Sequence, residues 1–277
     1  MKELNKELAV RSLIRGEFCP VCKEKRGGTQ LLCDACADAL SAEMRRGCVV
    51  CGKSMQDCTC STAALRRAGY AHLFKLCVYH PKDTASVTNK TIFVIKSHLD
   101  RLLFRLLARL MAYRLREAIE AINAAADEAA TAVVTYIPRS RRRIRKTGVD
   151  QARLLAKYLA AELSLPLVRL VKRRMRAKTQ KELSVFDRER NATSLFKLKN
   201  VRKLGGATVI IVDDLVASGN TMAQAGDLLM RGGAQRGITA CFASLPQKAE
   251  AQRFEEYIKD IPTPPNEPSE DIFSQGE

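Results

Sequence analysis

The sequence predicts an α/β protein, with an open, mostly parallel sheet preceded by a small cysteine-rich domain. Two observations predict this fold. After about residue 70, apolar runs typical of strands alternate with segments of helical periodicity, an order that favours parallel strands joined by helices. Eight of the ten cysteines fall between Cys19 and Cys60, which separates that short segment from the rest of the chain.

The individual elements follow from hydrophobic periodicity. Strands are expected where short apolar runs end in proline, glycine or charge, at 72–80, 131–138, 166–171, 195–198, 207–214 and 238–245. Helices are expected where apolar residues recur at helical spacing, at 1–15, 87–126, 149–163, the start of 184–196, and 221–233. In the longest of these, Arg101, Arg105 and Arg109 are four apart and share one face, which we expect to be solvated.

Composition then suggests four parts. They are an N-terminal helical segment (1–17), the cysteine-rich domain (18–62), the α/β domain (70–247) and an acidic tail (248–277). The tail carries eight acidic and three basic side chains, with several prolines and no periodicity, which is typical of disorder. We see no transmembrane run of about 18 apolar residues and no secretory apolar core near the start, so we expect a cytoplasmic protein without membrane insertion.

The net charge of +17 is concentrated in two blocks, RSRRRIRK (139–146) and KRRMRAKTQK (172–181). Each block contains six basic residues and no acidic one. Such blocks indicate a polyanionic partner, either nucleic acid or phosphorylated metabolites. The alternative is a solvated basic surface.

The cysteines have the spacing of metal knuckles. CPVC (19–22) and CDAC (33–36) are followed by CVVC (48–51) and CTC (58–60). A C-x-x-C knuckle brings two thiolates to one tetrahedral zinc, so the spacing predicts two structural Zn²⁺ sites. We favour sequential pairing; a cross-braced pairing and redox-active dithiols are the alternatives. The expected ligands are Cys19, Cys22, Cys33 and Cys36 in one site and Cys48, Cys51, Cys58 and Cys60 in the other.

The stretch VIIVDDLVASGNTM (209–222) has the pattern of a ligand site. In an open parallel sheet, ligands bind where strands end and loops lead into helices. Asp213 and Asp214 stand at such an end, and a loop of small residues follows. The loop amides and helix N-terminus suit a phosphate, and the two carboxylates suit the hydroxyls of a neighbouring diol. A phosphate beside a diol describes ribose 5-phosphate; the alternative is that the acids only cap the helix.

This stretch resembles the phosphoribosyl pyrophosphate (PRPP) signature of type I phosphoribosyltransferases, which has four apolar residues, two acids and a T-G-x-T turn. The resemblance implies an open sheet of the type I phosphoribosyltransferase kind, with Asp213 and Asp214 on the ribose hydroxyls. It implies that the 5-phosphate is held by Ala217, Ser218, Gly219, Asn220 and Thr221. Ser218 replaces the usual threonine and keeps its hydroxyl. Ala217 replaces an aspartate of the hypoxanthine-guanine enzymes, which argues against that activity.

Other motifs resemble the ComF family. In YIPRSRRRIRKTGVDQ the matching residues are Pro138, Arg145, Gly148 and Gln151, whereas Thr147, Val149 and Asp150 depart from the pattern. In TQKELSVFDRERNATSLF the matches are Gln180, Leu183, Ser184, Arg188, Asn191 and Phe196, and FVIKSHLD around Lys96 resembles the family's I-K-Y stretch. The resemblance covers roughly residues 18–246. It implies an N-terminal double zinc ribbon and an association with DNA uptake and natural competence.

The resemblance also implies roles for the basic blocks. The pyrophosphate loop of phosphoribosyltransferases corresponds to Arg139, Ser140, Arg141, Arg142 and Arg143. The 172–181 block is a candidate for the loop that closes over the site, and its nucleic-acid candidates are Lys172, Arg173, Arg174, Arg176 and Lys178. The expected reaction displaces pyrophosphate at the anomeric carbon, with Mg²⁺ bridging the ribose hydroxyls and pyrophosphate.

Three functions fit these patterns. The first is a PRPP-binding protein of DNA uptake, with single-stranded DNA and competence or recombination proteins as partners. The second is an active, Mg²⁺-dependent phosphoribosyltransferase of nucleotide metabolism. The third is a zinc-ribbon nucleic-acid-binding protein that PRPP only regulates. The sequence shows no feature that selects an acceptor nucleobase.

Overall fold

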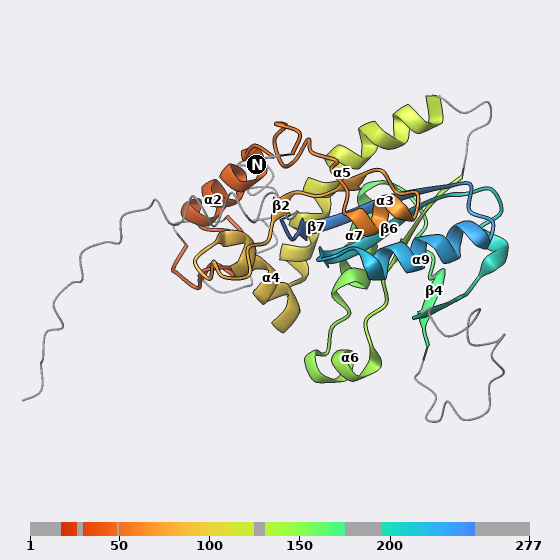
Figure 1. Cartoon of the computed structure of the whole chain (residues 1–277). Helices are drawn as coiled ribbons and strands as arrows, with labels where there is room; N and C mark the ends of the chain where they lie inside the picture. The colour runs from red at the N-terminus through yellow and green to blue at the C-terminus, as the bar shows by residue number, and fades with distance from the viewer. Residues whose placement is uncertain (1–17, 27–29, 49, 125–130, 175–194, 247–277) are drawn as a thin grey trace, which may run out of the picture.

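The computed structural model describes residues 18–26, 30–48, 50–124, 131–174 and 195–246 (Figure 1). Its centre is a parallel sheet with the strand order β1–β7–β6–β3, in which β2 also pairs with β7. The strands are β1 (Leu73–Phe74), β2 (Cys77–Val78), β3 (Ala132–Tyr136), β6 (Thr208–Val216) and β7 (Arg236–Ser244). The predicted open parallel α/β fold is confirmed.

Helices cover both faces of this sheet. One core includes side chains of α4 (Val87–Ser97), α5 (Arg101–Ala124) and α7 (Gln151–Glu162), and the other includes side chains of α3 (Ala63–Arg67) and α9 (Asn220–Arg231). Successive residues of β6 alternate between them: Ile210 and Val212 lie in the first core, and Val209 and Ile211 in the second. All four are fully buried, which explains why this strand is apolar at every position.

The cysteine-rich region folds around a helix that periodicity did not predict. α2 (Asp34–Arg45) begins directly after Cys33 and buries Leu40 and Met44 in the same core as α4. Figure 1 places α2 beside α4, away from α9. Within the described ranges, no helix is long and apolar enough to cross a membrane.

Two predicted elements are divided in the structure. The strand expected at 72–80 appears as β1 and β2, which pair with β7 in one continuous register. The helix expected at 87–126 is two helices, because Asp100 caps a new one. Its Oδ1 accepts hydrogen bonds from the amides of Leu102 and Leu103, each at 3.1 Å.

The predicted strand at 166–171 is wrong. Of that segment, Leu167 forms a single bridge to Val134, and the strand itself is β4 (Val171–Arg173), which begins at the segment's last residue. β4 pairs antiparallel with β5 (Phe196–Leu198) in a separate two-stranded ribbon. The chain therefore leaves the main sheet at the start of the second basic block.

The expected solvated arginine face of α5 is also wrong for two of its three residues. The Arg105 guanidinium lies 5.8 Å from the centre of the Tyr158 ring, and Arg109 Nε lies 3.2 Å from Glu162 Oε2. Both partners belong to α7. These arginines therefore help α5 to pack on α7, and Arg101 is the exposed one.

A short helix, α6 (Arg141–Thr147), follows β3 and ends at Gly148, whose positive φ of 71° closes the turn. Figure 1 shows α6 standing away from the sheet on the two segments that flank it. A second short element, the 3₁₀ turn η1 (Val201–Lys203), joins β5 to β6. The predicted N-terminal helix, the 184–196 helix start and the acidic tail lie outside the described residues.

Candidate functional site

The acid pair, Asp213 and Asp214, lies near the carboxyl end of β6, between the neighbouring strands β3 and β7. Both side chains are half-buried. Asp213 Oδ1 accepts a hydrogen bond from the Asp214 amide at 2.9 Å, and Asp214 Oδ2 lies 3.9 Å from Lys96 Nζ. Lys96 comes from the last turn of α4, so the site joins two distant parts of the chain.

The electrostatics of the acid pair favour a bound donor or cation. Burial raises the pKa of Asp213 well above its usual value, and repulsion from Asp214 raises it further, although Lys96 opposes this. Burial also raises the pKa of Asp150, which caps α7, and the charge of Asp214 adds to that effect. Three carboxyl groups thus influence one another beside one lysine, an arrangement that hydroxyl donors or a divalent cation would stabilise.

The loop that follows has the form of an anion site. Gly219, with φ of 79°, is the N-cap of α9, and Ser218 Oγ accepts a weak hydrogen bond from the Asn220 amide at 3.4 Å. Ala217, Ser218 and Asn220 are exposed. The first amides of a helix have no partner within it and carry its positive dipole. Residues 217–221 therefore form the loop and first turn of α9, two residues after the acid pair.

The predicted pyrophosphate residues divide into two groups. Arg139 turns toward the α6–α7 connection, where its guanidinium donates to Thr147 Oγ1 at 3.2 Å and to Gln151 Oε1. Gln151 Nε2 in turn donates to the Lys96 carbonyl at 3.2 Å. Ser140 caps α6, and the side chains of Arg141, Arg142 and Arg143 are exposed on that helix. Arg139 is thus linked to the Lys96 backbone, whereas the other arginines face solvent.

The β4–β5 ribbon, residues 171–173 and 196–198, carries a basic surface. Lys172 stands directly opposite Lys197 in the register. The charges of Lys197, Lys199, Arg141 and Arg169 lower the pKa of Lys172, Lys197 having the largest effect. Arg141 of the first basic block and Lys172 of the second therefore share one positive field. Lys197, Lys199 and Arg169 are residues that sequence reasoning missed, since no run of charge marks them.

Two of the other predicted nucleic-acid residues contact Phe196 of β5. The Arg173 guanidinium lies 5.7 Å from the centre of the Phe196 ring. Arg174 Nε donates to the Phe196 carbonyl at 3.1 Å. Arg176 and Lys178 lie outside the described residues.

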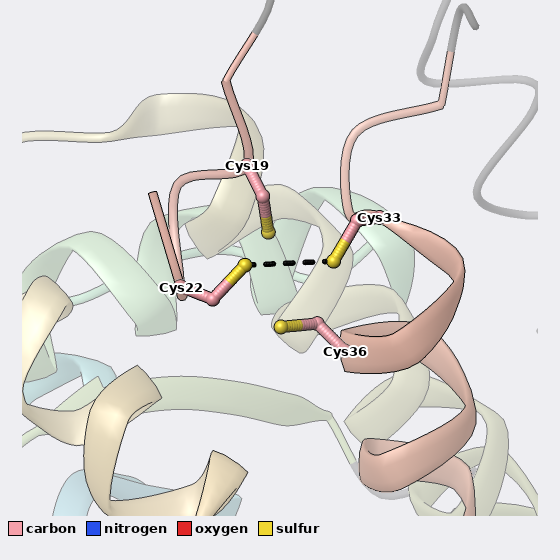
Figure 2. A group of neighbouring side chains, drawn as sticks. All are labelled: Cys19, Cys22, Cys33 and Cys36. Carbon is pink, nitrogen blue, oxygen red and sulfur yellow. Dashed lines mark hydrogen bonds between the residues drawn. The ribbon is translucent and has the colours of Figure 1, made fainter. Parts of the chain in front are cut away.

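The first cysteine cluster is shown in Figure 2, where the thiols of Cys19, Cys22, Cys33 and Cys36 point toward a common centre. Their sulfur atoms lie within 4.8 Å of one another, and Cys22 Sγ is 3.5 Å from Cys33 Sγ. A tetrahedral zinc with bonds of about 2.3 Å needs sulfurs about 3.8 Å apart. This donor set could hold a zinc ion, with two thiols from a turn and two from the start of α2.

The second cysteine cluster, Cys48, Cys51, Cys58 and Cys60, also has its sulfurs within 4.8 Å. Its first knuckle repeats that of the first cluster. The Lys23 amide donates to the Cys19 carbonyl at 3.0 Å, and the Gly52 amide to the Cys48 carbonyl at 2.7 Å. Lys23 and Gly52 have nearly the same positive φ, 69° and 72°. The two knuckles are one local motif used twice, and the groups brought together are those of sequential pairing.

The thiols of the two clusters are better suited to binding a metal than to existing as free thiolates. Burial, together with repulsion and hydrogen bonding from neighbouring cysteines, raises the pKa of Cys36 and of Cys60. Four thiolates at such distances therefore need a cation among them. All ten cysteines are free, and the remaining two, Cys77 and Cys241, are fully buried thiols, as their apolar contexts predicted.

Comparison with known families gives one domain match, to the phosphoribosyl transferase domain, over residues 117–269. The DNA utilization protein YhgH of Salmonella typhi is 35% identical over 102 residues, and so is YhgH of Salmonella typhimurium. Each alignment covers 36% of this chain and 44% of the relative. The chain therefore spans less than half the length of the curated relatives it matches.

Solved structures with a similar chain course include adenine phosphoribosyltransferase from Saccharomyces cerevisiae. It is 23% identical, with 58% of this chain and 76% of that chain covered and a TM-score of 0.33. Glutamine PRPP amidotransferase from B. subtilis is 14% identical, with 64% and 30% covered and a TM-score of 0.33.

Proposed function

The chain belongs to the phosphoribosyl transferase domain family, and from that premise we propose that it binds PRPP together with Mg²⁺ at the carboxyl end of β6. The ComF-type resemblance found in the motifs agrees with this membership and with the two cysteine clusters. The observation that carries the proposal is the half-buried acid pair, followed after four residues by Gly219, the N-cap of α9.

Each part of the site has a distinct task in this proposal. Asp213 and Asp214 accept hydrogen bonds from the two ribose hydroxyls, and the amides of residues 217–221 donate to the 5-phosphate. Lys96 offsets part of the acid pair's charge and holds Asp214 in place. Mg²⁺, when bound, would offset the negative charge of the pyrophosphate leaving group. The protein itself supplies position and electrostatics.

The exposed arginines of α6 extend this site toward the pyrophosphate. In the proposal, Arg141, Arg142 and Arg143 supply mobile positive charge to the pyrophosphate group, whereas Arg139 keeps its internal bonds. The link from Arg139 through Gln151 to the Lys96 carbonyl supports that division, because it ties the base of α6 to the helix that contacts Asp214.

We further propose that the basic surface of the β4–β5 ribbon contacts single-stranded DNA, in a protein of DNA uptake with competence or recombination proteins as partners. The name of the Salmonella relatives, DNA utilization protein, supports this assignment. The opposed Lys172 and Lys197 support it physically, because like charges facing each other across a ribbon are relieved by a polyanion. The ten free cysteines support a reducing cytoplasmic location.

Two alternatives compete with this function. An active phosphoribosyltransferase of nucleotide metabolism needs an acceptor base, and a zinc-ribbon nucleic-acid protein would use PRPP only as a regulator. Calorimetry with PRPP, with and without Mg²⁺, and then with single-stranded DNA separates the metabolic enzyme from the two functions that involve nucleic acid. Mg²⁺-dependent PRPP binding together with DNA binding supports the proposal. PRPP binding without DNA binding favours the metabolic enzyme, and absence of PRPP binding refutes the ribose-phosphate site.

A further inference from the structure

A buried lysine lies against the second cysteine cluster. Lys75 is only 8% exposed and lies between β1 and β2. Its Nζ donates to Cys58 Sγ at 3.3 Å and to the Cys60 carbonyl at 2.9 Å. Neither of these partners is a carboxylate. Lys75 is therefore an outer-shell hydrogen-bond donor to the second cluster.

With a metal bound, this contact would take on an electrostatic role. Four thiolates on one divalent ion keep a net charge of −2, and a lysine that donates to a ligand sulfur offsets part of it. Lys75 thus links the edge of the sheet, between β1 and β2, to the ligands of the second cluster.

The chain that follows the second cluster packs against the loop of the proposed phosphate site. Thr62, two residues after Cys60, caps α3 by accepting a hydrogen bond from the Leu65 amide at 3.3 Å. Thr62 also packs against Gly219: a Cβ added there would lie 2.2 Å from Thr62 Oγ1 and 3.1 Å from Leu65 Cγ. Gly219 is buried by this contact and is the N-cap of α9.

The end of the second cluster, residues 58–60, is fixed on the edge of the sheet. The Leu73 amide donates to the Thr59 carbonyl at 3.0 Å, and His72 Nδ1 lies 3.2 Å from Thr59 Oγ1. Residues 58–62 are therefore held at one end by the cysteines and Lys75, and at the other end by Gly219. Release of Cys58 and Cys60 would free the segment that supports Gly219.

We propose that metal in the second cysteine cluster holds the 217–221 loop in its binding conformation, with Lys75 and Thr62 as the positioning residues that connect them. The identity of the loop's ligand rests on the proposed function, whereas the coupling itself does not. The first cluster provides a natural control. Its Cys19 and Cys36 pack in the core with α4 and α5, whereas Leu65, which lies against Gly219, and Val216, three residues before it, pack in the other core.

The test compares Cys51→Ser with Cys22→Ser, which remove the same knuckle position from the two clusters. Zinc content, hydrogen exchange of a peptide covering 216–222 without ligand, and PRPP affinity with Mg²⁺ are measured in each. Wild type is expected to hold two zinc equivalents, and each variant to lose one. Cys51→Ser should speed loop exchange and weaken PRPP binding by about tenfold, within the usual range for coupled sites, while Cys22→Ser leaves both close to wild type.

Two further variants keep the test decisive if Cys51→Ser does not fold. Lys75→Met should weaken zinc in the second cluster by about 10- to 100-fold, as loss of an outer-shell partner does, and should speed loop exchange. Thr62→Ala should speed loop exchange while both zincs remain, and Thr84→Ala, the same change at an exposed threonine outside this segment, should not.

The outcomes distinguish the two proposals. Equal loop exchange in Cys51→Ser and Cys22→Ser, or unchanged exchange in Thr62→Ala, overturns the coupling. If wild type fails to bind PRPP, the proposed function fails, yet zinc-dependent loop exchange would still support the coupling.

Discussion

The acid pair and the basic ribbon both concentrate charge of one sign, but the fold holds them differently. Asp213 and Asp214 are half-buried in β6, just past the end of its pairing with β3 and within its pairing with β7, so their positions are set by the sheet. Lys172 and Lys197 face each other on a two-stranded ribbon, and Lys197 is exposed. Buried charge in a rigid frame costs stability and suits one small ligand, whereas exposed charge costs little and suits a long polyanion.

The largest expected effect comes from neutralising the acid pair. The double substitution Asp213→Asn with Asp214→Asn should weaken PRPP binding by at least about 1.5–3 kcal/mol, the range for lost hydrogen bonds to charged groups. Calorimetry with Mg²⁺ measures this. Asp227→Asn is the matched control, because Asp227 pairs with Arg231 on the exposed side of α9. Unchanged PRPP affinity in the double variant would refute the ribose site.

The second effect is on the stability of the ligand-free protein: neutralising Asp213 should increase it, whereas neutralising the acid pair should weaken PRPP binding. Because burial raises the pKa of Asp213, folding disfavours its charged form. Stability of the ligand-free protein should fall as pH rises from the ordinary aspartate pKa, near 4, through the raised pKa in the folded state. Asp213→Asn should therefore stabilise the ligand-free protein, and more at pH 8 than at pH 5. Urea unfolding at both pH values checks this; a stability gain that is independent of pH would contradict it.

A smaller effect is expected from the exposed basic residues, and it should appear in salt dependence. Replacing Lys172, Arg173, Arg174 and Arg176 with alanine should weaken binding of single-stranded DNA and flatten its log–log salt slope by about 0.7 for each lost phosphate contact. Neutralising Arg139–Arg143 should instead weaken PRPP binding. A wild-type salt slope near zero would remove the nucleic-acid role and leave a metabolite enzyme.

The smallest expected effect tests directly whether the basic ribbon carries repulsive charge. Lys197→Ala removes the like charge opposite Lys172, so it should slightly raise the melting temperature of the DNA-free protein, while weakening DNA binding. Thermal unfolding at low salt measures the gain. Lys157→Ala, a lysine on α7 away from the ribbon, is the control. Loss of stability in Lys197→Ala would show that the ribbon does not carry strained positive charge.

Sequence reasoning succeeded where local spacing carries the information. The course of β6 into the acid pair and on to α9 follows from an apolar run, small residues and helical periodicity. The eight cysteines follow from C-x-x-C spacing, and the repeated knuckle geometry at Lys23 and Gly52 shows how local that signal is. Reasoning failed at 166–171 and at Arg105 and Arg109, because strand partners and helix packing depend on residues elsewhere in the chain.

By itself, then, the sequence determined the α/β fold class, the acid pair before a helix N-terminus, and the two groups of thiols, since each depends on local spacing and periodicity. Only the tertiary structure decided that Lys96 meets Asp214, that Lys197 faces Lys172, and that Thr62 supports Gly219. These contacts join residues far apart in the chain. Their physical cause is the sheet register and the packing of two cores, which bring such residues together without any pattern in the sequence around them.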